Sequence, residues 1–130
     1  MLKLFFFINL IQSVNYQIPQ RIQIQSQKEY LRTVSSEEVL EFRDHENVRH
    51  VYLFSNPHCL WCKEAEDDLI KMSKELTEVE FYKINCQKEK EYCKQMNVHH
   101  VPTIYVFKNY VQRKCFDNEY NYLKKFIMKI

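Results

Sequence analysis

Residues 48–62 combine two features that strongly restrict the possible fold. Val48–Phe54 is a nearly continuous apolar run, which is typical of a strand buried on both faces in the middle of a parallel sheet. A short polar loop follows, and then the sequence Cys59-Leu60-Trp61-Cys62. Beyond it, apolar residues recur at steps of three and four as far as Leu76, which predicts a helix. The segment is therefore predicted to be a buried strand, a loop, and a helix that begins at a pair of cysteines.

The helix predicted from Cys62 to Leu76 has two faces of different character. One face is apolar and is expected to be buried; it consists of Cys62, Ala65, Leu69, Met72 and Leu76. The opposite face is charged and is expected to be solvated; it carries Lys63, Glu64, Glu66, Asp67, Lys71 and Lys74. Cys62 should therefore lie one turn inward from Cys59.

The position of Cys59 predicts a reactive sulfur. Free N–H groups and partial positive charge at a helix N-terminus favour a thiolate, and can lower a cysteine pKa from about 8.5 to about 7. Cys62 is placed to attack a mixed disulfide on Cys59 and so release a substrate. The sequence thus predicts a redox-active disulfide between Cys59 and Cys62 that needs no bound cofactor.

Composition sets the limits of the chain. Its 130 residues suffice for one domain with a modest core. The 19 basic and 17 acidic residues nearly balance, so the charge gives no case for nucleic-acid binding. Glycine is absent, and turns that need a positive φ should therefore use residues such as Asn109 and Asn118.

The N-terminal region is predicted to be a signal peptide over residues 1–15, followed by a glutamine-rich linker over 16–29 and the folded domain over 30–130. A positive start precedes the apolar run Leu4–Ile11, and Ser13 is a small residue suited to a cleavage site. The run is too short to span a bilayer. A frayed tail or an uncleaved anchor are the alternatives. We therefore expect the secretory pathway, in the endoplasmic reticulum lumen or secreted, without stable membrane insertion after signal removal.

Helical and strand patterns alternate through the rest of the domain. Strands are predicted at Tyr30–Val34, Glu80–Ile84, Thr103–Phe107 and Val111–Phe116, and helices from Ser35 (with Val39, Leu40 and Phe42 on its apolar side), at Lys88–Met96 and at Tyr120–Ile130. With the segment described first, the order is β-α-β-α-β-α-β-β-α. This order predicts an α/β fold with a mixed central sheet and flanking helices.

This order of elements, Cys59-Leu60-Trp61-Cys62 and Val101-Pro102-Thr103-Ile104 together resemble the thioredoxin fold. Within that fold the chain most resembles a single catalytic domain of the protein disulfide isomerase family, over Tyr30–Ile130. The resemblance implies that Pro102 is cis and faces the dithiol, and that the backbone of Val101 pairs with an extended client. An ordinary trans turn proline is the alternative.

The resemblance also bears on the remaining cysteines. It implies a structural disulfide between Cys86 and Cys93, because several disulfide isomerase domains carry a cysteine at a strand end and another in the next helix. Two free buried thiols or a second redox pair are the alternatives. Cys115 is left over; we interpret it as a small buried hydrophobe and assign it no role.

The chain departs from the family at three places beside the predicted site. His58 replaces the usual tryptophan before the first cysteine; it is either an exposed loop residue or a protonated imidazole that stabilises the Cys59 thiolate. Leu60-Trp61 replaces Gly-His, which puts strong oxidising or isomerising power in question. Leu53 replaces a buried acid that relays a proton to the second cysteine. We expect His58 and Trp61, with Val101 and Pro102, to contact the substrate.

Two functions follow from this pattern, and a third is weighed against them. The first is a monomeric thiol–disulfide oxidoreductase of isomerase type that acts on the cysteines of client proteins. The second is a catalytically weak module that binds or escorts clients. The third is zinc binding by Cys59 and Cys62 with either His99-His100 or Cys86 and Cys93; the spacing fits no common tetrahedral site, so no metal is expected.

Overall fold

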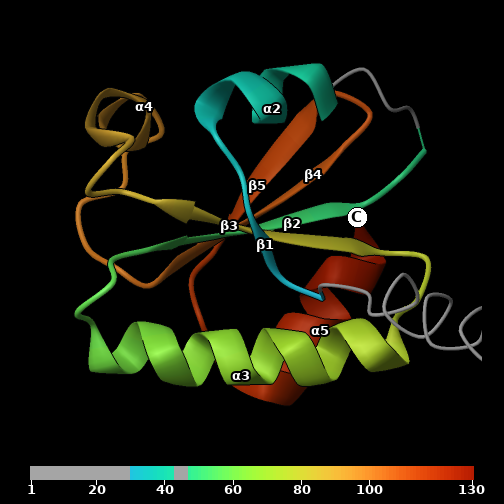
Figure 1. The fold of residues 1–130 in the computed structure, drawn as a ribbon. Helices are drawn as coiled ribbons and strands as arrows, with labels where there is room; N and C mark the ends of the chain where they lie inside the picture. Colours follow the sequence, from blue (N-terminus) through green and yellow to red (C-terminus); the bar gives the residue numbers. More distant parts are fainter. Residues whose placement is uncertain (1–29, 43–46) are drawn as a thin grey trace, which may run out of the picture.

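A computed structural model describes residues 30–42 and 47–130. The predicted signal peptide and linker, over residues 1–29, lie outside these described residues. The centre of the domain is a five-stranded sheet with the strand order β1-β3-β2-β4-β5. Helices cover both faces of this sheet (Figure 1). The prediction of a mixed sheet with flanking helices is therefore confirmed.

The elements follow the predicted order. The strands are β1 (Arg32–Thr33), β2 (His50–Ser55), β3 (Glu80–Asn85), β4 (Thr103–Lys108) and β5 (Val111–Cys115). The helices are α2 (Ser36–Phe42), α3 (Leu60–Glu75), α4 (Lys90–Gln95) and α5 (Tyr120–Lys129). Within the described ranges, no helix has both the length and the apolar character needed to cross a membrane.

Strand β2 lies at the centre of the sheet and is buried along its whole length. It runs parallel to β3 on one side and antiparallel to β4 on the other. The register pairs Ser55 with Asn85, and Phe54 with Thr103. The ends of β2 and β3 and the start of β4 therefore meet at one edge of the sheet, where the segment with Cys59 begins.

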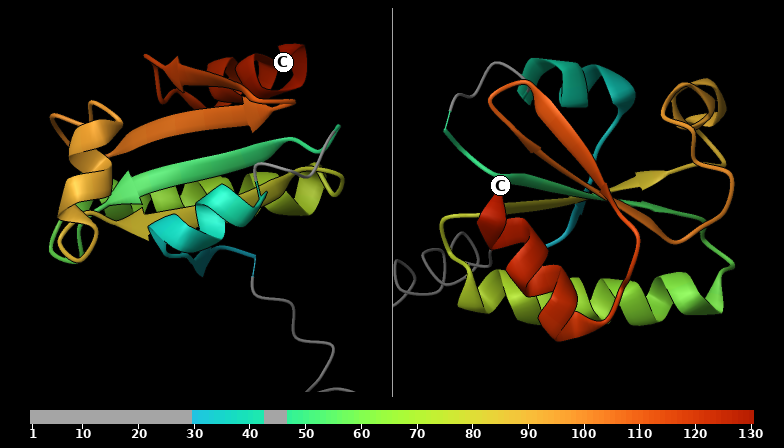
Figure 2. Two further views of the ribbon diagram at one scale, coloured as in Figure 1. Left: turned by 90° about the horizontal axis from the view of Figure 1, so that it is seen from above. Right: turned by 180° about the vertical axis from the view of Figure 1, so that it is seen from behind.

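Alternation along β2 divides the core into two layers. Val51 and Leu53 point to the layer that α3 and α5 cover, and both are fully buried there. Tyr52 and Phe54 point to the opposite layer, which contains Val39 of α2. The views in Figure 2 show α3 and α5 together on one side of the sheet and α2 on the other.

Two helices present the apolar faces that the sequence predicts. All five predicted core positions from Cys62 to Leu76 are buried; the last of them, Leu76, is the C-cap residue of α3. In α5, Leu123 and Ile127 are buried, and Tyr120 and Ile130 pack partly against the same layer. Steps of three and four residues along a helix keep these side chains on one face, so periodicity alone places them correctly.

The prediction that Leu40 belongs to the apolar side of α2 is wrong. Val39 is buried and Phe42 packs against the same layer, whereas Leu40 is 53% exposed. Residues three apart share a helix face, but adjacent residues point about 100° apart. Once Val39 and Phe42 contact the sheet, Leu40 must point toward solvent.

The β4–β5 hairpin shows how a chain without glycine makes a tight turn. Lys108 pairs with Val111, and the two residues between them, Asn109 and Tyr110, both have positive φ angles of 49° and 68°. A two-residue hairpin turn of type I′ requires a positive φ at both central positions. The expectation of a positive φ is confirmed for Asn109 and is wrong for Asn118. Asn47 and Asn97 are the other described residues with a positive φ.

Leu69→Ala should destabilise the domain by about 2–5 kcal/mol, because it removes a fully buried side chain between α3 and the sheet. Leu40→Ala makes the same chemical change at an exposed helix position and should alter the free energy of unfolding by no more than about 0.5 kcal/mol. Urea denaturation measures both values. Equal losses would contradict the packing of α2 described above.

Candidate active site

Helix α3 begins at Leu60, and Cys59 is its N-cap residue. The backbone of Cys59 is extended, with φ −109° and ψ 115°, so its side chain turns back over the first turn of the helix. The Cys59 Sγ atom accepts a hydrogen bond from the backbone N–H of Cys62 at 3.1 Å. The two sulfurs are joined by a disulfide, so the structure represents the oxidised state.

The two sulfurs differ in access. Cys62 is only 1% exposed, whereas Cys59 is half-buried. An incoming thiol or disulfide can therefore reach Cys59 first. The helix is 16 residues long and has no acidic residue in its first turn, so no side chain of that turn opposes negative charge at the helix N-terminus. This environment favours a thiolate at Cys59 after reduction.

The segment before β4 lies against Cys59. The peptide bond between Val101 and Pro102 is cis, and both residues are half-buried. The carbonyl oxygen of Val101 lies 4.0 Å from Cys59 Sγ. Residues 42 positions apart in the sequence thus meet at the edge of the sheet where β2 ends and β4 begins.

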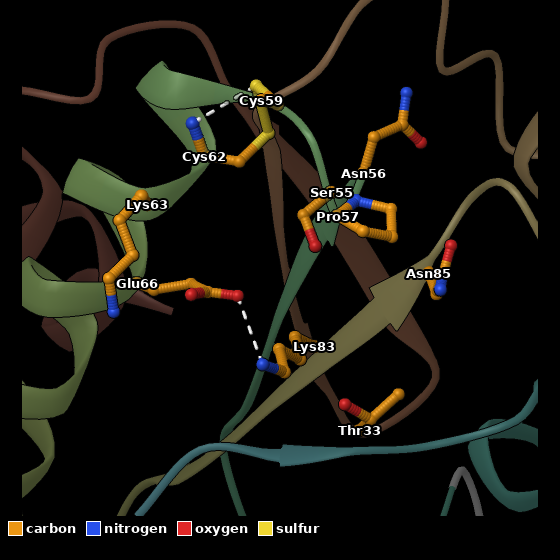
Figure 3. A pocket seen from close by; sticks show the side chains of 10 residues that line it. All are labelled: Thr33, Ser55, Asn56, Pro57, Cys59, Cys62, Lys63, Glu66, Lys83 and Asn85. Atoms are coloured by element: carbon orange, nitrogen blue, oxygen red, sulfur yellow. Dashed lines mark hydrogen bonds and ion pairs between the residues drawn. A yellow bond between two sulfur atoms is a disulfide. The ribbon is translucent and has the colours of Figure 1, made fainter.

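A hollow of about 250 Å³ opens below the disulfide. Its lining includes both sulfur-bearing residues, Cys59 and Cys62, and three charged side chains, Lys63, Glu66 and Lys83 (Figure 3). The Lys83 Nζ atom donates to the Glu66 carboxylate at 3.1 Å. The Glu66 side chain is 19% exposed and the Lys83 side chain 31%, so this ion pair is partly removed from solvent.

The expectation that Glu66 belongs to the solvated face of α3 is therefore wrong. Glu66 follows Cys62 by four residues, and residues four apart lie one above the other on a helix. The i, i+4 spacing from Cys62 was the available signal for its position. Its cation partner, Lys83, comes from the neighbouring strand β3, which no helical periodicity indicates.

A second hollow, of about 340 Å³, lies on the side of the disulfide where Trp61 and Pro102 are found. Glu64 and Asp68 of α3 also line it, as does His100. Trp61 is 68% exposed and is thus available for contact with another molecule. His58 is exposed in the loop before Cys59.

The structure joins Cys86 and Cys93 by a disulfide, with their Cα atoms 5.8 Å apart. The backbone N–H of Cys86 donates to the carbonyl of Ser55 at 2.9 Å, which places this bridge next to the end of β2. Cys115 is buried and free, and burial raises the pKa of its thiol. A raised pKa suppresses the thiolate, in keeping with a structural position for Cys115.

The part of the chain that the structure describes contains no set of side chains suited to bind zinc. Over residues 30–42 and 47–130, no three side chains of the types His, Cys, Asp and Glu are grouped as metal ligands would be. His99 and His100 are both exposed, in the loop that leads to Pro102.

Comparisons with known proteins agree with this architecture. The family model described as Thioredoxin matches residues 25–129. One similar solved structure is thioredoxin NaTrxh of Nicotiana alata, with a TM-score of 0.70 and 23% identity over 80% of this chain and 95% of that one. Spinach chloroplast thioredoxin f has a TM-score of 0.71 and 20% identity over 77% of this chain and 92% of that one. Fasciola hepatica thioredoxin has a TM-score of 0.68 and 18% identity over 75% of this chain and 96% of that one. A comparison with curated proteins gives no match.

The predicted thioredoxin fold is thus confirmed. A thioredoxin domain with a Cys59-x-x-Cys62 pair suggests a thiol–disulfide oxidoreductase. At identities below 25%, the solved structures support the fold alone. The closer resemblance to a disulfide isomerase domain remains a prediction.

Replacing both Cys86 and Cys93 by alanine should lower the free energy of unfolding by about 2–3 kcal/mol, since a short closed loop then no longer restricts the unfolded chain. Urea denaturation of the double variant measures the loss. Alkylation of the non-reduced, denatured wild-type protein should leave both residues unmodified and label Cys115. Labelling of Cys86 and Cys93 under these conditions would show that the bridge does not form.

Proposed function

The chain belongs to the thioredoxin family, and we propose that it exchanges disulfides with cysteine-containing client proteins. The observation that carries the proposal is the position of Cys59 Sγ. It lies at the start of α3, accepts the Cys62 N–H at 3.1 Å, and is 4.0 Å from the Val101 carbonyl beside the cis bond to Pro102. One reachable sulfur thus has a stabilising donor, a resolving partner and an adjacent backbone for client binding.

The proposed exchange has two steps. The reduced Cys59 thiolate attacks a client disulfide; a bond forms between Cys59 and one client sulfur, and the other client sulfur leaves as a thiolate. Cys62 then loses its proton and attacks Cys59 Sγ, which expels the second client thiolate and forms the Cys59–Cys62 disulfide. The client gains two electrons and the protein loses two. The reverse sequence would oxidise a client dithiol.

Client binding would use the surface beside the disulfide. The backbone of Val101 is proposed to pair with an extended client segment, in the manner of strand addition, with Pro102 holding the turn. Trp61 and His58 are exposed on either side of Cys59 and are proposed to contact the client. Phe116 follows Cys115, which pairs with Ile104 near the start of β4, so it adds an exposed aromatic at the same edge.

Isomerase-type activity in the secretory pathway is the more specific form of this proposal. Two features support it: the signal-peptide composition of residues 1–15, and a Cys86–Cys93 bridge separate from the redox pair. Structural disulfides persist in oxidising compartments and are rare in the cytosol. The reduction potential of the Cys59–Cys62 pair would distinguish an isomerase from a reductant.

A client-binding module with little catalysis is the second candidate. Three exposed apolar side chains favour it because they suit binding as well as chemistry: Leu60 and Trp61, between the two cysteines, and Phe116, just after β5. The absence of an acid at position 53 also favours a module with little catalysis, because Leu53 is buried in apolar surroundings and cannot relay a proton to Cys62.

Cys62→Ser should convert the protein into a trap for clients. Cys59 can still attack a disulfide, but the resolving thiol is gone, so mixed disulfides should accumulate and survive in non-reducing gels. Cys59→Ser is the matched control and should form none. Absence of adducts with a correctly folded Cys62→Ser protein would instead favour the client-binding module.

The secretory proposal predicts cleavage near residue 15 when the full chain is expressed in eukaryotic cells, because Ser13 precedes the site at the position where small residues are required. Mass spectrometry of the purified protein gives its N-terminus. Ser13→Arg should block the cleavage, whereas Ser26→Arg, in the predicted linker, should not. An unprocessed chain that remains in the cytosol would contradict the proposal.

A further inference from the structure

We propose that Glu66 is the carboxylate through which Cys62 loses and regains its proton during thiol–disulfide exchange. The inference rests on the proposed function, because it concerns the second step of that reaction. It rests on the hollow that Glu66 shares with Cys62 and on the ion pair between Glu66 and Lys83 (Figure 3).

Cys62 has a specific need for such a group. Its side chain is 1% exposed, so the residue has little direct contact with bulk solvent. A thiol must be deprotonated before it can attack a disulfide. The N-terminal charge of α3 acts first on Cys59, which caps the helix, and the Cys62 N–H is already directed at Cys59 Sγ. The resolving thiol therefore needs a separate proton acceptor.

The hollow supplies one acceptor of the required kind. The titratable groups that line it are Cys59, Cys62, Lys63, Glu66 and Lys83. Among these, Glu66 is the single carboxylate, and it comes from the helix turn directly after Cys62. Leu53, where the family has its acid, is fully buried in the apolar layer and cannot accept a proton.

Water can connect Glu66 with Cys62. A volume of about 250 Å³ exceeds the roughly 30 Å³ that one water occupies in the liquid, and the walls carry polar groups from Ser55 and Asn85. In Figure 3 the Glu66 carboxylate is directed across the hollow toward Lys83, between α3 and β3. Lys83 thus holds the carboxylate on the hollow side of α3; it acts as a positioning residue.

The proton balance of the second step is complete. The Cys62 thiol gives its proton through water to the Glu66 carboxylate, which becomes a carboxylic acid. The Cys62 thiolate forms its bond to Cys59 Sγ, and the electron pair of the broken Cys59–client bond leaves on the client sulfur. Glu66 then releases the proton to solvent through the open hollow, and the client thiolate takes up a proton from solvent. No further oxidant or reductant is needed.

The test separates the two steps of exchange. Reduced protein is mixed with a peptide that carries a fluorophore through a disulfide, and acid quenching follows the mixed disulfide as it forms and decays. Glu66→Gln keeps the size of the side chain and removes the acceptor. Asp67→Asn is the matched control, because it removes the next carboxylate of α3, which lies exposed and pairs with Lys63.

At neutral pH, Glu66→Gln should form the mixed disulfide at the wild-type rate and resolve it at least about tenfold more slowly. The difference should vanish by about pH 9.5, where an ordinary thiol ionises without help. Asp67→Asn should behave as wild type throughout. Thermal unfolding of each variant verifies the fold.

Two results would overturn the inference. In the first, the mixed disulfide decays as fast in Glu66→Gln as in Asp67→Asn. In the second, the decay in Glu66→Gln is slowed by the same factor at every pH, which would indicate a structural role for Glu66. A wild-type protein that never forms the mixed disulfide would instead refute the proposed exchange itself. The two failures are therefore distinguishable.

Discussion

Strand β2 is stable only if both of its faces and both of its edges are covered, and this requirement organises the domain. All six of its residues are buried. Strands β3 and β4 form hydrogen bonds with the backbone groups along its two edges. Helices on opposite faces of the sheet cover its side chains (Figure 1). Since β3 is parallel and β4 antiparallel to β2, the chain leaves β2 at the edge where β4 begins. Cys59 and Val101 meet there because the sheet brings their flanking segments together.

Local periodicity explains what could be predicted from the sequence. The burial of Leu69 and Ile127, and the order of the elements, follow from steps of two, three and four residues within one segment. The position of Leu40 depends on which side of a short helix reaches the sheet, and sequence spacing does not determine that side. The positive φ angle of Tyr110 follows from the length of the hairpin turn, in a chain that has no glycine to place there.

The same distinction applies to the site. The two cysteines and Pro102 are recognisable because their spacing along the chain is characteristic, whereas Glu66 depends on a partner, Lys83, that comes from another element. A charged residue on a helix is most often solvated, and the sequence contained nothing to oppose that interpretation except its spacing from Cys62. Sequence reasoning thus identified the sulfurs but not the polar groups around them.

A physical reason favours a carboxylate at Glu66 over one at position 53. A carboxylate at position 53 would lie among apolar side chains such as Val51 and Leu69, where an unpaired charge is strongly destabilising. At Glu66 the carboxylate is only partly buried, has a cation at 3.1 Å and borders a hollow open to water. The core can therefore remain apolar at Leu53 while a carboxylate still borders the hollow that Cys62 lines.

The second disulfide takes part in this arrangement through α4. Cys93 lies in α4, and Cys86 follows β3 and donates its N–H to Ser55 at the end of β2. The loop after α4 leads to Val101, and it is fixed by bonds from Val98 N–H to the Cys93 carbonyl and from Thr103 Oγ1 to the His100 carbonyl. The bridge therefore joins α4, from which the loop to Val101 departs, to the segment after β3, which is hydrogen-bonded to the end of β2. Both ends of this disulfide thus lie in segments that lead toward the site, while its sulfurs are separate from the Cys59–Cys62 pair.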